Sequence, residues 1–120
     1  MKYLILIYRN PSTRKIWEEG FTDADRAAAY RAYAELNDSL TASGELIISE
    51  SLMDEEEARH VTVRDGKALA SDGPFAEVKE LLAGFYLVEA DSMDRAVEIA
   101  AAIPEVAAGA AEIRPVRELP

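Results

Sequence analysis

The chain lacks cysteine altogether and has a single histidine among its 120 residues. Without cysteine there is no disulfide, no thiolate nucleophile and no cysteine-based zinc or iron–sulfur site. Carboxylates are then the main remaining metal ligands, and the Glu55-Glu56-Glu57 run has no spacing that defines a metal cage. We therefore expect no metal and no cofactor. This composition favours a cytoplasmic location, because the cytoplasm is reducing.

Basic residues and long apolar runs are also scarce. Thirteen basic residues stand against 23 acidic ones, which gives a formal net charge of −10. Such a charge repels both a phosphate backbone and an anionic bilayer surface. No apolar run approaches the ~20 residues that cross a bilayer, and the N-terminal residues lack the features of a secretory signal. We expect neither a nucleic acid nor a membrane as partner.

The residues that are present suit one soluble globular domain. Hydrophobic residues make up 49% of the chain and charged residues 30%, which allows a buried core beneath a solvated exterior. A chain of 120 residues is of typical single-domain size, so we expect one domain over residues 1–120. The sequence contains no nucleophile elbow, phosphate-binding loop or dinucleotide fingerprint, which removes several enzyme classes.

The pattern of apolar residues divides the chain into short strands and two main helices. Residues 3–8 are uniformly apolar or aromatic, as in a strand buried on both faces, and residues 85–88 are nearly so. Thr22 can cap a long alanine-rich helix that Gly44 can end. The elements predicted in chain order are a strand at 3–8, a loop at 9–20, a helix at 22–43, a strand at 45–49, an acidic connection at 54–57, a hairpin at 60–71, a short helix between Pro74 and Gly84, a strand at 85–90, a helix at 92–103 and an edge segment at 111–119.

This order predicts an α+β fold. It corresponds to a ferredoxin-like split βαβ protomer with an inserted hairpin. Two main helices cover only one face of such a sheet, yet the strands at 3–8 and 85–88 carry apolar side chains on both faces. A second copy of the chain would cover the other face, and two-fold dimers are the commonest oligomers. The pattern therefore predicts a homodimer.

Two segments in the middle of the chain form a recognisable signature. The sequence VTVRDGK at residues 61–67 is followed by SDGPFAEVKE at residues 71–80. With the flanking residues near both ends, they resemble the DGPF family within the YCII-related group. The resemblance covers nearly the whole chain and implies a dimeric α/β barrel of ferredoxin-like protomers. It implies no settled reaction. The wider group is suspected to contain small-molecule enzymes, and many members are encoded beside extracytoplasmic-function sigma factors.

The sequence departs from the wider group at one point. That group is often described with a histidine–aspartate pair as its active site, but His60 stands at the start of the hairpin rather than near the first strand or helix. The pair is therefore not carried over to this chain. Asp72 matches the aspartate of the DGPF motif, and Glu77, Lys79 and Glu80 match the rest of it. For His60, an exposed position on a strand edge competes with a role in titration near neutral pH.

Asp72 is the candidate catalytic residue. Beside a helix N-terminus its carboxylate would act as a general base or accept a hydrogen bond from substrate. As a helix cap it would instead be structural, with Gly73 and Pro74 shaping the turn. The candidate substrate-binding residues comprise cations for an anionic group, tyrosines on strands and residues of the motif, namely Arg64, Lys79, Tyr8, Tyr86, Phe75 and Glu77. Each also has a structural explanation, as a partner of nearby carboxylates, a core aromatic or a solvated charge.

Two classes of function follow from these candidates. The leading one is a small-molecule site, binding or catalytic, near Asp72 in the cleft of the dimer. The alternative is a non-catalytic regulatory or assembly protein linked to sigma-factor systems, whose acidic surface meets a basic partner. A concavity shared by Asp72, Lys79 and tyrosine side chains would favour the first class. An outward-facing or capping Asp72 would favour the second.

Overall fold

The computed structural model describes residues 1–73 and 80–120, except for the side chains of residues 13 and 14. In these ranges the chain forms α-helices, short helical turns and antiparallel strands. The elements are β1 (Lys2–Arg9), α1 (Pro11–Lys15), the π-helical turn η1 (Ile16–Gly20), α2 (Asp23–Ala42), β2 (Leu46–Ser51), the 3₁₀ turn η2 (Glu55–Glu57), β3 (Arg59–Arg64), β4 (Lys67–Asp72), β5 (Leu81–Glu89), α3 (Met93–Ala102), α4 (Pro104–Ala108) and β6 (Ala110–Pro115).

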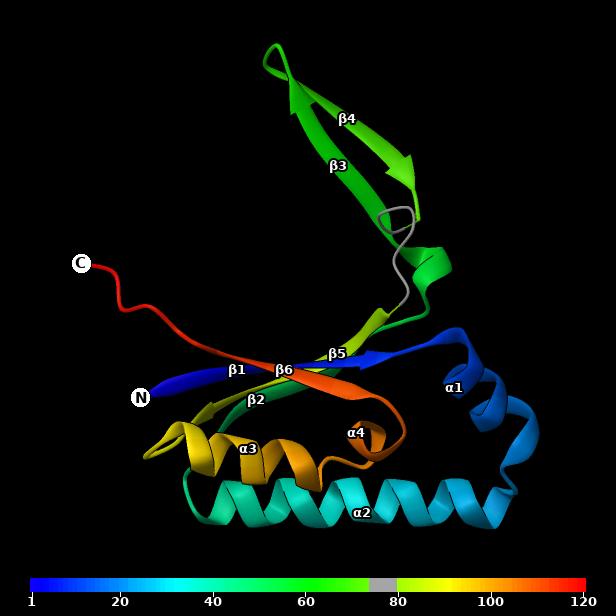
Figure 1. Ribbon diagram of the computed structural model, residues 1–120, viewed down its shortest axis with the longest axis vertical. Coiled ribbons are helices and arrows are strands. Elements are labelled where there is room, and N and C mark those ends of the chain that lie inside the picture. Colours follow the sequence, from blue (N-terminus) through cyan, green and yellow to red (C-terminus); the bar gives the residue numbers. More distant parts are fainter. Residues whose placement is uncertain (74–79) are drawn as a thin grey trace.

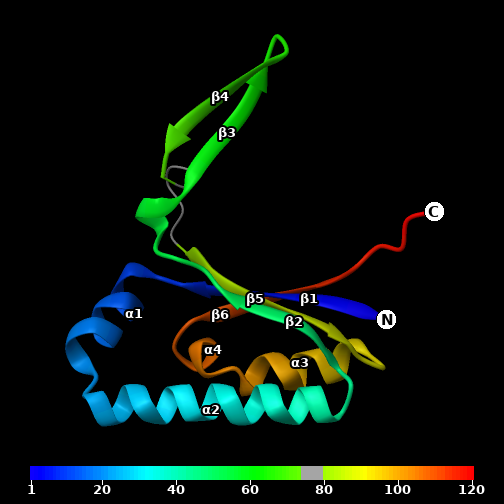
Figure 2. The same cartoon turned by 180° about the vertical axis from the view of Figure 1, so that it is seen from behind.

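The strands form a main sheet and a separate hairpin. The main sheet has the order β2-β5-β1-β6, with antiparallel neighbours throughout, and β3 pairs with β4 alone. Helices α2, α3 and α4 lie on one side of the main sheet (Figure 1). The hairpin rises on the other side, and the view from behind agrees (Figure 2). The chain is therefore a mixed α+β protein whose helices cover one face of the sheet.

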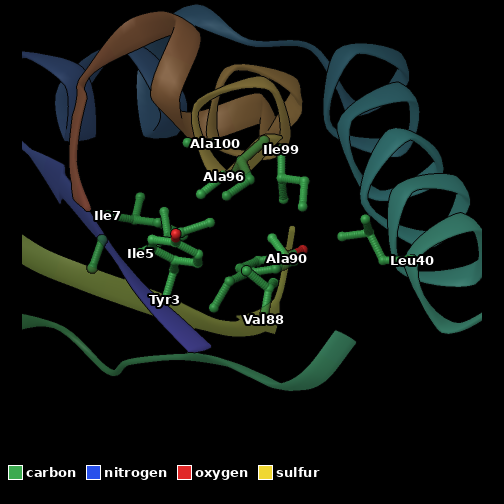
Figure 3. Close-up of a cluster of buried hydrophobic side chains, with 12 residues drawn as sticks. Tyr3, Ile5, Ile7, Leu40, Val88, Ala90, Ala96, Ile99 and Ala100 are labelled. Atoms are coloured by element: carbon green, nitrogen blue, oxygen red, sulfur yellow. The ribbon is translucent and has the colours of Figure 1, made fainter. Parts of the chain in front are cut away.

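The hydrophobic core lies between the main sheet and the helices. Alternate residues of β1 point inward because successive strand side chains face opposite sides, so Tyr3, Ile5 and Ile7 are buried (Figure 3). Burying one large aliphatic side chain stabilises a fold by roughly 1.5–3 kcal/mol. The inward stripe predicted for the helix at 92–103 is confirmed, since all four of its residues are buried: Ala96, Ile99, Ala100 and Ile103.

Helix α2 begins and ends where the sequence predicts. The Thr22 hydroxyl accepts a hydrogen bond from the Asp25 backbone N–H at 3.1 Å, and the Asp25 carboxylate accepts one from the Thr22 N–H at 2.9 Å. This reciprocal pair is a capping box. The bond from the Thr22 N–H lowers the pKa of Asp25. Gly44 has a φ of +81°, the left-handed geometry that ends a helix.

The loop predicted at residues 9–20 is wrong. These residues form α1 and η1, because Pro11 takes the first helical position, where a missing N–H is no loss. A second proline begins a helix later in the chain. Pro104 lies just beyond α3, as predicted, and also begins the short helix α4, which was not predicted.

The short helix predicted between Pro74 and Gly84 is wrong at its C-terminal end. Strand β5 already begins at Leu81, so Gly84 lies inside a strand. A Cβ at Gly84 would stand 2.7 Å from the backbone oxygen of Glu50 on β2. Glycine is therefore present to let two strands approach, not to end a helix. The first part of the predicted helix, residues 74–79, lies outside the described residues.

The predicted hairpin is confirmed, together with the edge position of the last strand. Asp65 and Gly66 connect β3 to β4 with φ values of +53° and +75°, as a two-residue hairpin turn requires. Strand β6 lies at the edge of the main sheet and ends at Pro115. Among the helices within residues 1–73 and 80–120, none has the length and hydropathy needed to cross a membrane.

Candidate functional site

Two adjoining cavities lie where α2 and α4 meet the β2–β5 edge of the main sheet. Their volumes are about 290 and 320 Å³. They adjoin because four residues line both: Tyr30, Tyr33, Ser51 and Glu105. We call the two cavities together the tyrosine cleft. Together they reach the size of pockets that hold small molecules, roughly 300–1,000 Å³.

The junction of the two cavities is formed by a tyrosine and a glutamate. The Tyr33 hydroxyl on α2 donates a hydrogen bond to Glu105 Oε1 on α4 at 3.0 Å. Burial raises the pKa of Tyr33, and the neighbouring Glu105 carboxylate raises it further. The hydroxyl therefore stays protonated at neutral pH and acts as a donor. Glu105 is left as the acceptor with further lone pairs to offer.

A second tyrosine anchors the inner wall of the cleft. Tyr86 on β5 is buried, and its hydroxyl donates a hydrogen bond to Asn37 Oδ1 on α2. Burial raises the pKa of Tyr86, while hydrogen bonds with Ser49 and Asn37 act in the opposite direction. Ser49 faces Tyr86 directly across the β2–β5 pair. Polar contacts therefore join β5 to α2 at the inner wall of the cleft.

The outer wall of the cleft is aromatic. Trp17 of η1 packs against Phe21 with ring centroids 5.3 Å apart, and edge-on against Tyr30 at 5.9 Å. All three residues line the second cavity. Such rings offer faces on which a planar group stacks or a cation rests.

The charge of the cleft is negative. Among the described lining residues Arg9 is the one cation, and it stands 2.8 Å from Asp54 and 3.5 Å from Glu55. Glu50, which also lines the cleft, is a second lining carboxylate beside Asp54. Glu105 adds a further negative charge a short way along the cleft. An anionic ligand would therefore be repelled, whereas a neutral or cationic one would not.

Comparison with known proteins shows which family the chain belongs to. Residues 1–120 match the YCII-related domain. The chain belongs to the YCII-related domain family. It is also similar to an uncharacterised protein of Rhizobium meliloti (strain 1021), with 32% identity over 120 residues that cover 96% of this chain and 91% of that protein. Neither match names a reaction, so we infer the function of this YCII-related protein from the geometry of its cleft.

The structure brings one of the predicted site residues into the tyrosine cleft. Tyr86 lines it, while Tyr8 alternates with the inward-facing Ile7 and so lies toward the opposite face of the sheet. Arg64 ends β3 at the tip of the hairpin and is exposed. Three predicted residues of the motif lie outside the described residues, namely Phe75, Glu77 and Lys79.

Asp72 lies on the hairpin, away from the cleft. It is the last residue of β4, its side chain is 87% exposed, and it forms an ion pair with Arg59 on the neighbouring strand. His60, on β3, is half-buried rather than exposed. Within the described ranges no cluster of three or more histidine, aspartate or glutamate residues is arranged to hold a metal ion.

Most of the cleft residues were missed by the sequence interpretation. The spacing of Tyr30, Tyr33 and Asn37 puts all three on one face of the helix predicted at 22–43. A polar and aromatic stripe of that kind was a usable signal. Nothing in the local sequence marks Glu105, which reaches Tyr33 from 72 residues further along the chain.

Proposed function

We propose that this YCII-related protein binds a small neutral or cationic molecule in the tyrosine cleft. The observation that carries the proposal is the Tyr33–Glu105 hydrogen bond, which places a half-buried donor and a carboxylate acceptor where the two cavities join. A few convergent polar groups in an otherwise apolar and aromatic cavity are typical of ligand sites. A planar group would lie against Trp17 and Tyr30, and an amine or hydroxyl would donate to Glu105.

Binding is proposed here without a named reaction. The hydroxyls of Tyr33 and Tyr86 both have a raised pKa and already donate, to Glu105 and Asn37. Neither is therefore an activated nucleophile. If the bound molecule reacts, Glu105 is the group placed to accept a proton from it.

We propose that the wider architecture is that of a dimeric α/β barrel. Without the hairpin, the sheet order β2-β5-β1-β6 corresponds to the order 2-3-1-4 of a ferredoxin-like split βαβ fold. The sheet face without helices supports a homodimer. The segments at residues 61–67 and 71–80 support assignment to the DGPF subfamily.

A second candidate function is supported by the position of Asp72. Its exposed carboxylate pairs with Arg59 on the hairpin and faces no described cavity. This arrangement favours a structural motif, as in a non-catalytic regulatory or assembly protein. The acidic surface of the chain would then meet a basic protein partner, of the kind that sigma-factor systems provide.

The cleft proposal is tested by a thermal-shift screen with three sets of small aromatic molecules of matched size, one cationic, one neutral and one anionic. A molecule that binds only the folded protein raises the unfolding midpoint. We expect cationic or neutral molecules to raise it and anionic ones to leave it unchanged. Glu105→Gln should abolish the shift, while Glu35→Gln, an exposed glutamate on α2, should retain it. Binding that survives Glu105→Gln, or binding of anions alone, would contradict the proposal.

A further inference from the structure

The β3–β4 hairpin stands apart from the rest of the described chain. Its strands pair with each other and not with the main sheet, and it projects well beyond the helices and sheet (Figure 1). Every residue of β4 is exposed, as is every residue of β3 except His60. A two-stranded hairpin alone is marginally stable in water at best. A hairpin that persists in this form needs another surface to pack against.

One face of the hairpin is apolar. Val61 lies opposite Ala70, and Val63 lies opposite Ala68. Directly opposed residues of an antiparallel pair project to the same side, so these four form one surface, which we call the arm face. Val61 is 55% exposed and Val63 71% exposed, far more than valines in a folded core. The other face of the hairpin carries Thr62 opposite Leu69.

The main sheet also carries apolar side chains on its face without helices, the side toward which the hairpin rises (Figure 2). Five residues point away from the helices there, because they alternate with the buried positions of their strands and are opposed across the sheet. We call this surface the open face; its residues are Leu4, Leu6, Ile48, Phe85 and Leu87.

The exposed area of the chain is larger than that of a compact monomer of its mass. The accessible surface is 8531 Å². A compact monomer of 13.2 kDa is expected to expose roughly 6,400 Å². The excess of about 2,000 Å² is more than twice the roughly 800 Å² that each partner of a stable complex buries. The exposed valines of the arm face contribute to this excess, which is large enough for a standard interface.

Local charge complementarity favours a contact between the hairpin of one copy and the body of another. Residues 59–72 contain three basic and two acidic residues, which gives the hairpin a formal charge of +1. Because the whole chain carries −10, the other residues together carry −11. A hairpin of weakly positive charge is attracted to an acidic body, and the body of another copy is one. A two-fold arrangement also covers both arm faces and both open faces at once.

We propose that the β3–β4 hairpin is an arm that clasps a second copy of this chain, with its arm face against the body of that copy. The proposal rests on the proposed homodimer and adds to it the surface that holds the two copies together. Each copy would extend its arm to the other, so that a single dimer would bury both arm faces away from solvent. The remainder of the interface would come from the two open faces.

A pair of variants on opposite faces of the hairpin tests this proposal. Val63→Glu puts a carboxylate into the arm face, whereas Leu69→Glu puts the same charge on the other face. Burying an unpaired charge is costly, so Val63→Glu should weaken dimerisation by about tenfold or more in dilution series followed by analytical ultracentrifugation. Leu69→Glu should leave the dissociation constant within about threefold of the unmodified chain.

The possible outcomes distinguish a failure of the arm proposal from a failure of the homodimer proposal. Equal dissociation constants for the two variants would overturn the arm proposal. If Leu6→Glu on the open face then dissociated the dimer, the open-face homodimer would stand without the arm. A chain that is monomeric at all concentrations would remove both. The ligand-binding proposal is measured separately, by the thermal-shift screen, and does not depend on these results.

A crosslinking measurement keeps the proposal falsifiable if Val63→Glu fails to fold. The chain has no cysteine, so Val63→Cys provides one unique attachment point for a benzophenone photocrosslinker. The arm proposal expects irradiation to join two chains, with the crosslink mapping to the body of the second chain. A crosslink within a single chain would show the arm folded back on its own sheet and would overturn the proposal.

Discussion

The helix-covered body and the hairpin use similar apolar residues but bury them to very different extents. In the body, Ile5 and Val88 are fully buried between the sheet and α3. In the hairpin, Val61 and Val63 are more than half exposed although their strand pairing is regular. Regular backbone pairing therefore does not by itself bury a side chain. A strand becomes part of a core only when a second layer packs on it.

The largest difference is expected from truncation in the two regions. Ile5→Ala removes a fully buried side chain and leaves a cavity, so it should lower the free energy of unfolding by about 2–5 kcal/mol. Val63→Ala in the hairpin should lower the free energy of unfolding of the isolated protomer by less than about 1 kcal/mol. Urea denaturation at low protein concentration, where dimers dissociate, measures both. Equal losses would show that the hairpin belongs to the same cooperative unit as the body.

Replacing one glycine in each region should also change stability by different amounts. Gly84→Ala in the body would place a Cβ 2.7 Å from the Glu50 backbone oxygen, so β2 and β5 would have to separate. We expect a loss of about 1–3 kcal/mol in the free energy of unfolding. Gly73 follows the hairpin with a φ of +85°, and apart from Gly73 and its chain neighbours no atom of the described residues lies within 4 Å of a Cβ built there. Gly73→Ala should cost about 1 kcal/mol through backbone strain alone. Thermal unfolding of both variants gives the order, and a larger loss for Gly73→Ala would contradict it.

Ion pairs of the two regions should differ in what they contribute to stability, and the pair in the body should make stability depend on pH. Glu45, before β2, accepts hydrogen bonds from Arg95 on α3 at 2.8 and 2.9 Å. Hydrogen bonds from Arg95 and Ser43 lower the pKa of Glu45 to about 2. The folded pKa lies below the unfolded value of about 4.3, so this stabilisation is complete above that pH and is lost as the pH falls toward 2.

The corresponding measurement compares urea midpoints at pH 7 and pH 3. The unmodified protein should lose more stability between these pH values than Glu45→Gln, which lacks the titrating group. Glu35→Gln, an exposed change on α2, should behave like the unmodified protein. An identical pH response in Glu45→Gln would mean that the bond to Arg95 contributes nothing. In the hairpin, the largely exposed ion pair of Arg59 with Asp72 should contribute little to stability.

The elements that could be predicted from sequence are those whose cause is local. Thr22 caps α2 through a residue three positions away, and Asp65-Gly66 supplies its own positive φ values. Gly84 was misinterpreted because the reason for glycine there is the carbonyl of Glu50, on another strand. Local sequence shows that a residue is unusual, but not which distant group makes it necessary.

The candidate site was harder to predict than the fold for the same reason. Tyr33 and Glu105 meet only after α2 and α4 have packed on the same face of the sheet, and neither segment alone signals the pairing. Tyr86 was included because a tyrosine on a strand can line a pocket, and it does line the cleft. The role of Asp72 and the homodimer stay predictions.

The smallest expected effect is that of Asp72→Asn, and it decides between the two interpretations of the motif. The side chain is 87% exposed and its partner is an exposed arginine on the same hairpin, so the change should alter stability by no more than about 0.5 kcal/mol. Because Asp72 does not line the tyrosine cleft, a molecule found in the thermal-shift screen should still bind with unchanged affinity. Isothermal titration calorimetry of the variant measures this directly. Loss of binding with an intact fold would instead show that the Asp72 carboxylate reaches the ligand in the assembled protein, and the site would have to be extended to the motif.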